Sequence, residues 1–451
     1  MATHDPTDLA APDPADEPTG PPSARRLRTF DSLIDVPAFR WYLLSMTGNW
    51  SALQMQQVAR GFLAYQLTGS FVALGLVELG NSLPRVVLAL YGGVVADRAS
   101  RRVTVQVGQA IQAALAAVIA VLLFLGMLRF EHLVISAVIQ GAVNSFALPA
   151  RQAMIPEIVG PSRVMNAFAL NVFALNVMRL VAPALAGGII ALVGAAWVFV
   201  VMGVLNGLAV VAMFPVPATN AASRAALARG GAPEAPAPPR AAHGGGMRGR
   251  TGLSDIAEAF RYLGTQRLLV ILLGLQGLTS MLALPYQRLL PGFVDEVLSS
   301  SPDQTAVLMG LLLTFTAVGA LVGSLLIASL PNRARGQLLI ASLIIFGIAL
   351  AGFAASHWLW VSAATVLVLG VGQAGRQSLV SILIQSTVSD TFRGRISSIQ
   401  LLEDGVESLG IFGIAVLAEV VGPQIALGAV AASLVALGLA LYATRTIRTL
   451  Q

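Results

Sequence analysis

The feature that most limits the possible fold is a series of twelve apolar stretches. A helix that crosses a lipid bilayer needs about 20 apolar residues, and the uninterrupted stretches are long enough. Their approximate limits are residues 41–66, 71–95, 103–128, 133–154, 164–193, 195–214, 268–294, 304–330, 337–356, 358–388, 396–421 and 424–443. Only 11% of the 451 residues are charged, against about 25% in soluble proteins. We therefore predict an all-α membrane protein with twelve transmembrane helices.

Two segments lack the composition of a span. Residues 1–24 are rich in Pro, Asp and Ala, and residues 215–267 are rich in Ala, Pro, Gly and Arg, so neither can bury a core. The predicted organisation is a disordered cytoplasmic tail (1–24), a six-helix half (25–214), a cytoplasmic linker (215–267) and a second six-helix half (268–451). Within the linker, residues 253–263 are predicted to form a short amphipathic helix on the membrane surface.

Arginine placement predicts the orientation, because basic residues favour cytoplasmic loops. All 28 basic residues are Arg. With the N-terminus inside, 22 of them fall in inner segments and only Arg129 falls in an outer loop. Five lie inside spans: Arg60, Arg85, Arg179, Arg288 and Arg376. We predict a multi-pass protein of the cell membrane with both termini cytoplasmic.

The two halves also echo each other in sequence. Arg40 and Arg267 precede the first helix of each half, and Arg60 and Arg288 follow them at nearly equal spacing. Many transporters repeat a helical unit in this way and place a site between the halves. Chance placement of two arginine pairs is the alternative interpretation.

Several kinds of chemistry are excluded. The chain has no Cys, four His and no Lys, so we expect no disulfide, no metal, no cofactor and no P-loop ATPase. We do not expect an enzyme or a nucleic-acid partner, since a basic balance in a membrane protein reflects its loops.

A short motif at the end of the second stretch resembles the signature of the major facilitator superfamily, Gly-x-x-x-Asp-Arg-x-x-Arg-Arg. The matching residues are Gly92, Gly93, Asp97, Arg98, Arg101 and Arg102. Smaller matches (Tyr65 to Ser70, Pro149 to Arg151, and Arg393 to Arg395) resemble the branch of enterobactin-type siderophore exporters and macrolide efflux pumps. The resemblance implies two six-helix halves that rock around a central cavity.

The resemblance also implies roles for the motif. Asp97 would face the N-terminus of the eleventh helix near Gly394 and latch the halves on the cytoplasmic side. Arg98, Arg101 and Arg102 either share that role or only set the topology. Two family features of proton antiporters are incomplete, because Ala137 stands where an Arg precedes Gln140, and because Met178 and Ala182 replace glycines. Arg179 is a candidate substitute for the missing basic group.

Charges inside the spans are functional candidates, because each is costly in the bilayer. From their depth, Arg60 and Glu78 are predicted to pair. Glu403 and Glu407 share a helix face, with Asp404 turned away, and the repulsion among three acids favours proton binding by at least one. Arg85, Arg179 and Arg376 are candidate partners. Proton coupling and static pairing are both open for Glu403, Asp404 and Glu407. Glu78 is a further candidate for proton coupling, and static pairing or an outer gate is the alternative for Glu78 with Arg60.

A polar run on the first helix predicts a ligand cavity lined by amides and an indole. Hydrogen bonding between helices is the alternative. The candidates are Asn49, Trp50, Gln54, Gln57, Gln140, Asn144, Gln373, Gln377 and Gln385.

We therefore predict a monomeric secondary transporter that exports an amphipathic small molecule, such as a drug or siderophore, against protons by alternating access. The alternatives are a proton-coupled importer of an anionic solute and a transport-inactive membrane scaffold or sensor.

Overall fold

The computed structural model describes residues 31–98, 100–217, 266–330, 334–388 and 403–444, and every regular element there is helical. After a short helix, α1 (Asp31–Asp35), six long helices follow. They are α2 (Pro37–Thr68), α3 (Phe71–Arg98), α4 (Arg101–Phe124), α5 (Phe130–Val159), α6 (Val164–Val193) and α7 (Ala195–Ala212). The predicted tail and the amphipathic helix of the linker lie outside the described residues.

The second group contains α10 (Arg267–Ala283), α11 (Pro285–Phe293), α12 (Pro302–Ser329), α13 (Arg335–Ala354), α14 (Leu359–Thr387), α16 (Glu403–Val421) and α17 (Pro423–Ala443). The seventh predicted span is broken into α10 and α11 at Leu284, because Pro285 cannot continue the hydrogen-bond ladder of the preceding helix. A π-helical turn, Val294–Leu298, completes it.

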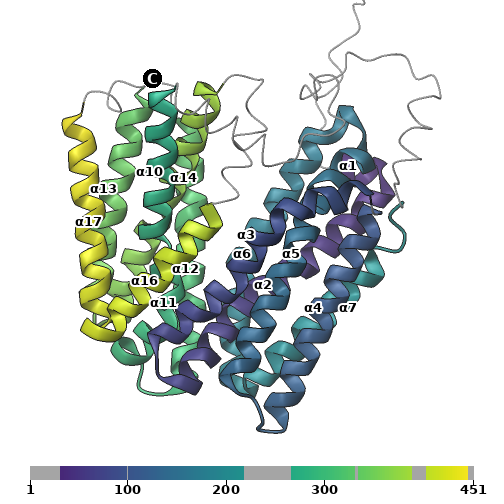
Figure 1. The fold of residues 1–451 in the computed structure, drawn as a ribbon, viewed down its shortest axis with the longest axis horizontal. Helices are drawn as coiled ribbons and strands as arrows, with labels where there is room; N and C mark the ends of the chain where they lie inside the picture. The colour runs from purple at the N-terminus through teal and green to yellow at the C-terminus, as the bar shows by residue number, and fades with distance from the viewer. Residues whose placement is uncertain (1–30, 99, 218–265, 331–333, 389–402, 445–451) are drawn as a thin grey trace, which may run out of the picture.

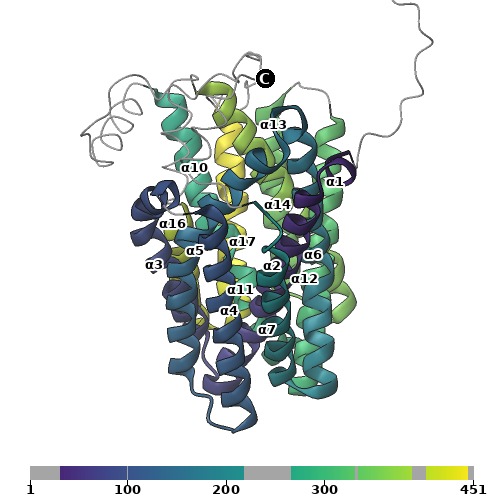
Figure 2. The same cartoon turned by 90° about the vertical axis from the view of Figure 1, so that its right-hand side faces the viewer.

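Helices α2 to α7 form one bundle and α10 to α17 form the other (Figure 1). Helices α4, α7, α13 and α17 pack mainly against helices of their own bundle. Figure 2 shows α4 and α7 on the outside of the first bundle. Both described chain ends lie at the same end of the molecule, which we call the termini end; the other is the far end. The predicted twelve-helix architecture is confirmed.

Two seams join the halves, one between α6 and α12 and the other between α3 and α16. At the first seam, Gly187 lies against the carbonyl of Ala306. A Cβ atom on Gly310 would lie 2.6 Å from the Pro183 carbonyl oxygen. At the second, a Cβ on Gly75 would lie 3.0 Å from the Cα of Phe412. Small residues allow this close approach, which drives helix association where lipid removes the hydrophobic advantage.

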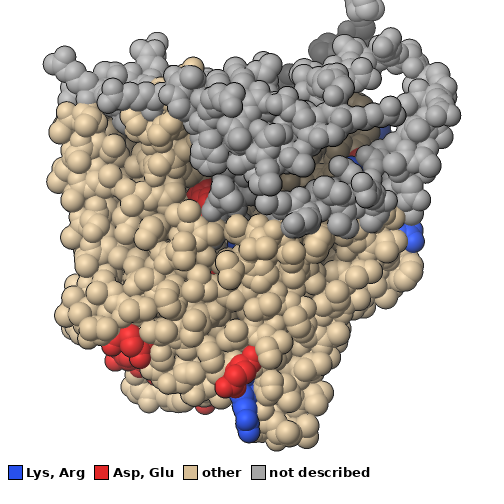
Figure 3. All heavy atoms as spheres, in the orientation of Figure 1, with Lys and Arg blue, Asp and Glu red and all other residues tan. Residues whose placement is uncertain are grey.

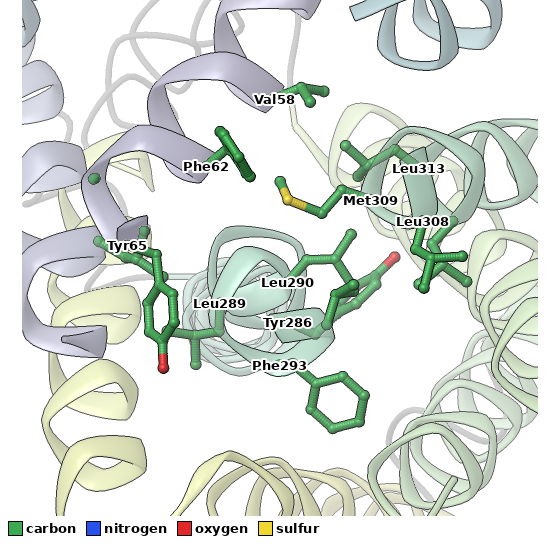
Figure 4. Packing of buried hydrophobic residues seen from close by; sticks show 14 of the residues in the cluster. Val58, Phe62, Tyr65, Tyr286, Leu289, Leu290, Phe293, Leu308, Met309 and Leu313 are labelled. Carbon is green, nitrogen blue, oxygen red and sulfur yellow. The ribbon is translucent and has the colours of Figure 1, made fainter. Parts of the chain in front are cut away.

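The halves meet at the far end and diverge toward the termini end (Figure 1). At the far end α11 packs between α2 and α12, where its Leu290 and Phe293 are buried (Figure 4). The Tyr65 hydroxyl of α2 donates a 2.6 Å hydrogen bond to Glu296. These contacts close the far end with residues of both halves.

A second far-end contact is a helix cap supplied by the opposite half. The Glu419 carboxylate of α16 accepts hydrogen bonds from the backbone N–H groups of Phe71 (2.6 Å) and Val72 (3.3 Å) and from the Ser70 hydroxyl (3.1 Å). The first N–H groups of a helix have no partner within the helix, and a negative charge is favourable there. Glu419 therefore ties α16 to the start of α3.

The described surface suits lipid. Figure 3 shows few charged side chains on it, and large apolar residues such as Leu192 and Trp360 are more than three-quarters exposed. Ten described segments are long and apolar enough to cross a membrane. The two remaining long helices are α2, which carries the polar run, and α16, which carries four acidic residues.

We expect Gly187→Val to destabilise the protein, because the added side chain meets the Ala306 backbone and forces α6 from α12. Overpacking of this kind costs about 1–3 kcal/mol. The neighbouring Gly188→Val is the control, since a Cβ atom added there would have no other atom within 4 Å and the change in helix propensity is the same. Thermal unfolding in detergent would show a lower midpoint for Gly187→Val alone; equal midpoints would contradict the seam.

Candidate transport site

A cavity of about 290 Å³ lies between the halves near the far-end closure. It is lined by parts of α2, α3, α5, α11 and α12, and most of the lining comes from the first half. Three guanidinium groups (Arg60, Arg85 and Arg288) and one carboxylate (Glu78) line it, with amides and aliphatic side chains between them. The walls thus combine strong charges with apolar surface.

Arg60 is joined to the amides of the cavity. Its Nη2 donates a 2.6 Å hydrogen bond to Oε1 of Gln140. Gln140 in turn donates to Gln56 on α2, and Asn81 of α3 donates to the same Gln140 oxygen at 3.3 Å. Three helices of the first half therefore share one polar network. The Arg60 side chain is buried, and its Nε has no hydrogen-bond partner.

Glu78 pairs with Arg288 across the two halves, with Nε and Oε2 3.3 Å apart. The predicted Arg60–Glu78 ion pair is therefore wrong, although the two side chains lie close enough to interact electrostatically. The depth argument placed Arg60 and Glu78 at the same level. The rotation of α2 and the position of α11, which depth does not determine, gave each residue another partner.

The predicted amide residues separate into two groups. Gln54, Gln57, Gln140 and Asn144 line the cavity. Asn49 is instead fully buried, and it donates to Gln112 at 2.8 Å and Asn206 at 2.9 Å. It serves helix packing, which was the alternative interpretation.

Three of the remaining candidates, Trp50, Gln373 and Gln377, lie away from the cavity wall. Trp50 packs against a separate buried cluster. Gln373 accepts hydrogen bonds from Tyr286 and Gln287 of α11, and Gln287 lines the cavity. Gln377 is exposed. The side chain of Gln385 lies outside the described residues.

Glu403 and Glu407 of α16 lie in a polar cluster of the second half. Glu403 accepts hydrogen bonds from the Gln276 amide and the Ser280 hydroxyl of α10. Arg376 of α14 is buried, donates to Thr279 Oγ1 at 2.8 Å, and interacts electrostatically with Glu403 and Glu407. Arg376, one of the three predicted partners, therefore lies beside these two acids. The Asp404 side chain lies outside the described residues.

The sequence matches the description Major Facilitator Superfamily over residues 42–402. The chain belongs to this superfamily. Its members are secondary active transporters that carry small molecules across membranes, and this chain is a multi-pass membrane protein of that kind.

Individual relatives are distant. The chain is 21% identical over 391 residues to the Staphyloferrin A transporter of Staphylococcus aureus (strain NCTC 8325 / PS 47), covering 84% of this chain and 88% of that protein. The fold is similar to that of the nucleoside transporter NupG (TM-score 0.66, 12% identity, 90% of this chain and 98% of the other). It is also similar to that of a variant of the peptide transporter POT (TM-score 0.69, 13% identity, 92% and 96%).

Only part of the superfamily motif is open to description. Gly92, Gly93, Asp97 and Arg98 belong to the last turns of α3, but their side chains, and Gly394, lie outside the described part of the chain, so the latch stays a prediction.

The last two arginines of the motif tie α4 to its own bundle. Arg101 pairs with Glu157 of α5. Arg102 donates to the carbonyl oxygens of Phe214 (3.2 Å) and Val216 (2.9 Å), just after α7. These contacts hold the termini end of the first half together.

A basic group from another helix lies near Ala137, the position where the family's Arg is missing. Arg60 of α2 contacts Gln140, one turn beyond Ala137 on α5. Arg179, the predicted substitute, is exposed on α6. It lies one turn from Pro183 on the same face, and the carbonyl oxygen of the adjacent Leu180 accepts a 3.0 Å hydrogen bond from Thr314 of α12.

Sequence reasoning missed several residues. Asn81 and Gln287 line the cavity, but single amides in apolar stretches gave little signal. Arg151 was counted with the inner loops, yet it is buried in α5, and Glu419 resembled an ordinary acid at a helix end. Gln56, which also lines the cavity, was part of the polar run that indicated this helix.

We expect Gln140→Leu to destabilise the protein by about 1–3 kcal/mol, the cost of leaving buried polar groups without partners, because Arg60 and Gln56 both bond this amide. Gln377→Leu is the control, since Gln377 is exposed. Equal thermal unfolding midpoints for the two variants would argue against the network.

Proposed function

We propose that this protein is a proton-coupled exporter of an amphipathic small molecule, with both termini in the cytoplasm. The observation that carries the proposal is the placement of Glu403 and Glu407 beside the buried Arg376 inside the membrane-spanning bundle. A carboxylate in such surroundings changes its interactions when it binds a proton, and intramembrane acids of this kind serve as proton relays in transporters.

The position of the acids links proton binding to movement of the halves. Glu403 and Glu407 share the face of α16 directed at their own bundle, where Glu403 bonds α10. Gly405 lies on the opposite face, and a Cβ there would lie 3.2 Å from Val86 of α3. Protonation of Glu403 removes one hydrogen-bond acceptor from the contact with α10, which allows α16 to move. Because α16 also forms a seam with α3, its movement would shift one half against the other.

The cavity supports an amphipathic cargo. Leu53, Leu74, Val77, Met309 and Leu313 supply apolar surface next to the amides and guanidinium groups. The similarity to the Staphyloferrin A transporter and the short motifs shared with siderophore and macrolide exporters favour a siderophore-like or drug-like molecule. The protein is proposed to act as a monomer, since each cavity is formed by one chain.

Orientation can be tested because the chain has no Cys. Met127 is 60% exposed in the far-end loop between α4 and α5, and Gln266 is exposed at the termini end. In intact cells, a membrane-impermeant maleimide should label Met127→Cys, and should label Gln266→Cys only after the cells are broken. The reverse pattern would place the termini outside.

Coupling can be tested with inside-out membrane vesicles and a panel of fluorescent amphipathic compounds. We expect an inward-acidic gradient to drive uptake by the unmodified protein. The Glu403→Gln/Glu407→Gln variant should lose this stimulation while still binding the compound, because neither side chain can exchange a proton. Glu131→Gln, which alters an exposed acid at the far-end start of α5, should behave as the unmodified protein.

Gradient-driven uptake that persists in the double variant would make these acids structural and contradict this coupling site. Accumulation by right-side-out vesicles with an outside-acidic gradient, and none by inside-out vesicles, would instead establish an importer. The guanidinium groups of the cavity favour an anionic solute for that second candidate function.

A further inference from the structure

We infer that the central cavity binds an anionic group of the cargo, of the carboxylate class, through Arg60, Arg85 and Arg288. This inference deepens the proposed function by naming the chemical class of the cargo, and it rests on that function only in taking this cavity as the cargo site. It applies equally to export and import.

The charge balance of the cavity is the first support. Among the described lining residues, three guanidinium groups face a single carboxylate, Glu78. Glu78 pairs with Arg288, and Arg60 bonds a neutral amide, Gln140. Arg85 has an interaction partner of its own, so Arg60 and Arg288 share one acid in a part of the bundle where charges are costly.

The guanidinium groups also act on one another. Arg60 and Arg288 are close enough to repel each other, although Glu78 attracts Arg60 more strongly than Arg288 repels it. The Nε of Arg60 is buried without a hydrogen-bond partner, and the side chain is 8% exposed. An anion in the cavity would lower this repulsion and accept hydrogen bonds from the fork-shaped guanidinium groups, which match carboxylate geometry.

The rest of the cavity specifies what carries the anion. The Arg288 side chain is 31% exposed and Glu78 is 15% exposed, so both remain accessible to a ligand. Gln54, Gln57 and Asn144 offer hydrogen bonds, and the aliphatic side chains of α3 and α12 offer apolar surface. A volume of about 290 Å³ fits a compact aromatic or aliphatic skeleton bearing one or two carboxylates.

A purely structural role for these arginines makes a different prediction for Glu78. If the Glu78–Arg288 pair only braces the halves, then removing either charge harms binding. If the site holds an anion, Glu78 competes with the ligand for Arg288, so Glu78→Gln should strengthen binding while Arg288→Gln weakens it. Opposite signs at two partners of one ion pair distinguish the interpretations.

The experiment measures binding of naphthalene-2,6-dicarboxylate, a fluorescent aromatic dianion, to the purified full chain in lipid nanodiscs. Its dimethyl ester has the same ring without the charges. We expect the dianion to bind and the ester to bind at least about tenfold more weakly, since a hydrogen bond to a charged group is worth about 1.5–3 kcal/mol. Arg60→Gln, Arg85→Gln and Arg288→Gln should each weaken dianion binding by a similar factor. Glu78→Gln should strengthen it.

Arg163→Gln is the matched control, because Arg163 pairs with Asp35 at 3.0 Å outside the cavity, and it should leave binding unchanged. Thermal unfolding of each variant shows that the protein is folded. Equal binding of dianion and ester, or weaker binding after Glu78→Gln, would overturn the inference.

The inference and the proposed function fail separately. Proton-driven uptake of uncharged compounds, together with no preference for the dianion, would uphold transport and reject the anion site. Charge-selective binding without proton-driven transport would do the reverse.

Discussion

The structure depends on the cost of placing charge inside a lipid bilayer. No water is available there, so a guanidinium or carboxylate must find its partners within the protein. Some of these groups find partners in their own half, as Arg376 does at Thr279, but Glu78 reaches its partner Arg288 only because the halves meet. The glycine seams bring the backbones close enough for this meeting. Polar contacts and close packing are therefore two parts of one constraint: the halves must touch where the charges are.

The contacts that join the halves differ along the molecule. At the far end two contacts hold the halves together. The Glu419 carboxylate caps the first backbone N–H groups of α3, and Tyr65 donates a hydrogen bond to Glu296. Toward the termini end the bundles diverge. If the far end opens, Glu419 releases two backbone N–H groups, and water then accepts their hydrogen bonds. The N–H groups therefore exchange a carboxylate acceptor for water. The motif between α2 and α3, in which Gly69 has φ of +61°, supplies the tight turn that presents Ser70 to this cap.

The sequence predicted the helical architecture of the described residues well, because hydropathy does not depend on how helices rotate. It predicted contacts less well. Depth along the helices predicted that Arg60 pairs with Glu78. The rotation of α2 about its axis instead directs Arg60 to Gln140. In the polar run of α2, Asn49 and Gln54 look equivalent in sequence, but Asn49 faces α4 and α7 and Gln54 faces the cavity. Partners on distant segments, such as Glu419 for Phe71, have no local signal at all.

The broken helix α10–α11 connects the two candidate sites. Its second part carries Arg288, which lies in the cavity, and its first part carries Gln276 and Ser280, which hold Glu403. Pro285 separates the parts, so they can turn relative to each other more easily than two ends of a continuous helix. If the cavity binds an anion and Glu403 binds a proton, both events act on this one helix. An anion at Arg288 withdraws it from Glu78 on α3, and a proton at Glu403 loosens α10 from α16. Coupling between cargo and proton would then need no direct contact between them. It would need only that the α10–α11 helix loses its contacts with Glu78 and Glu403 when the cargo and the proton bind.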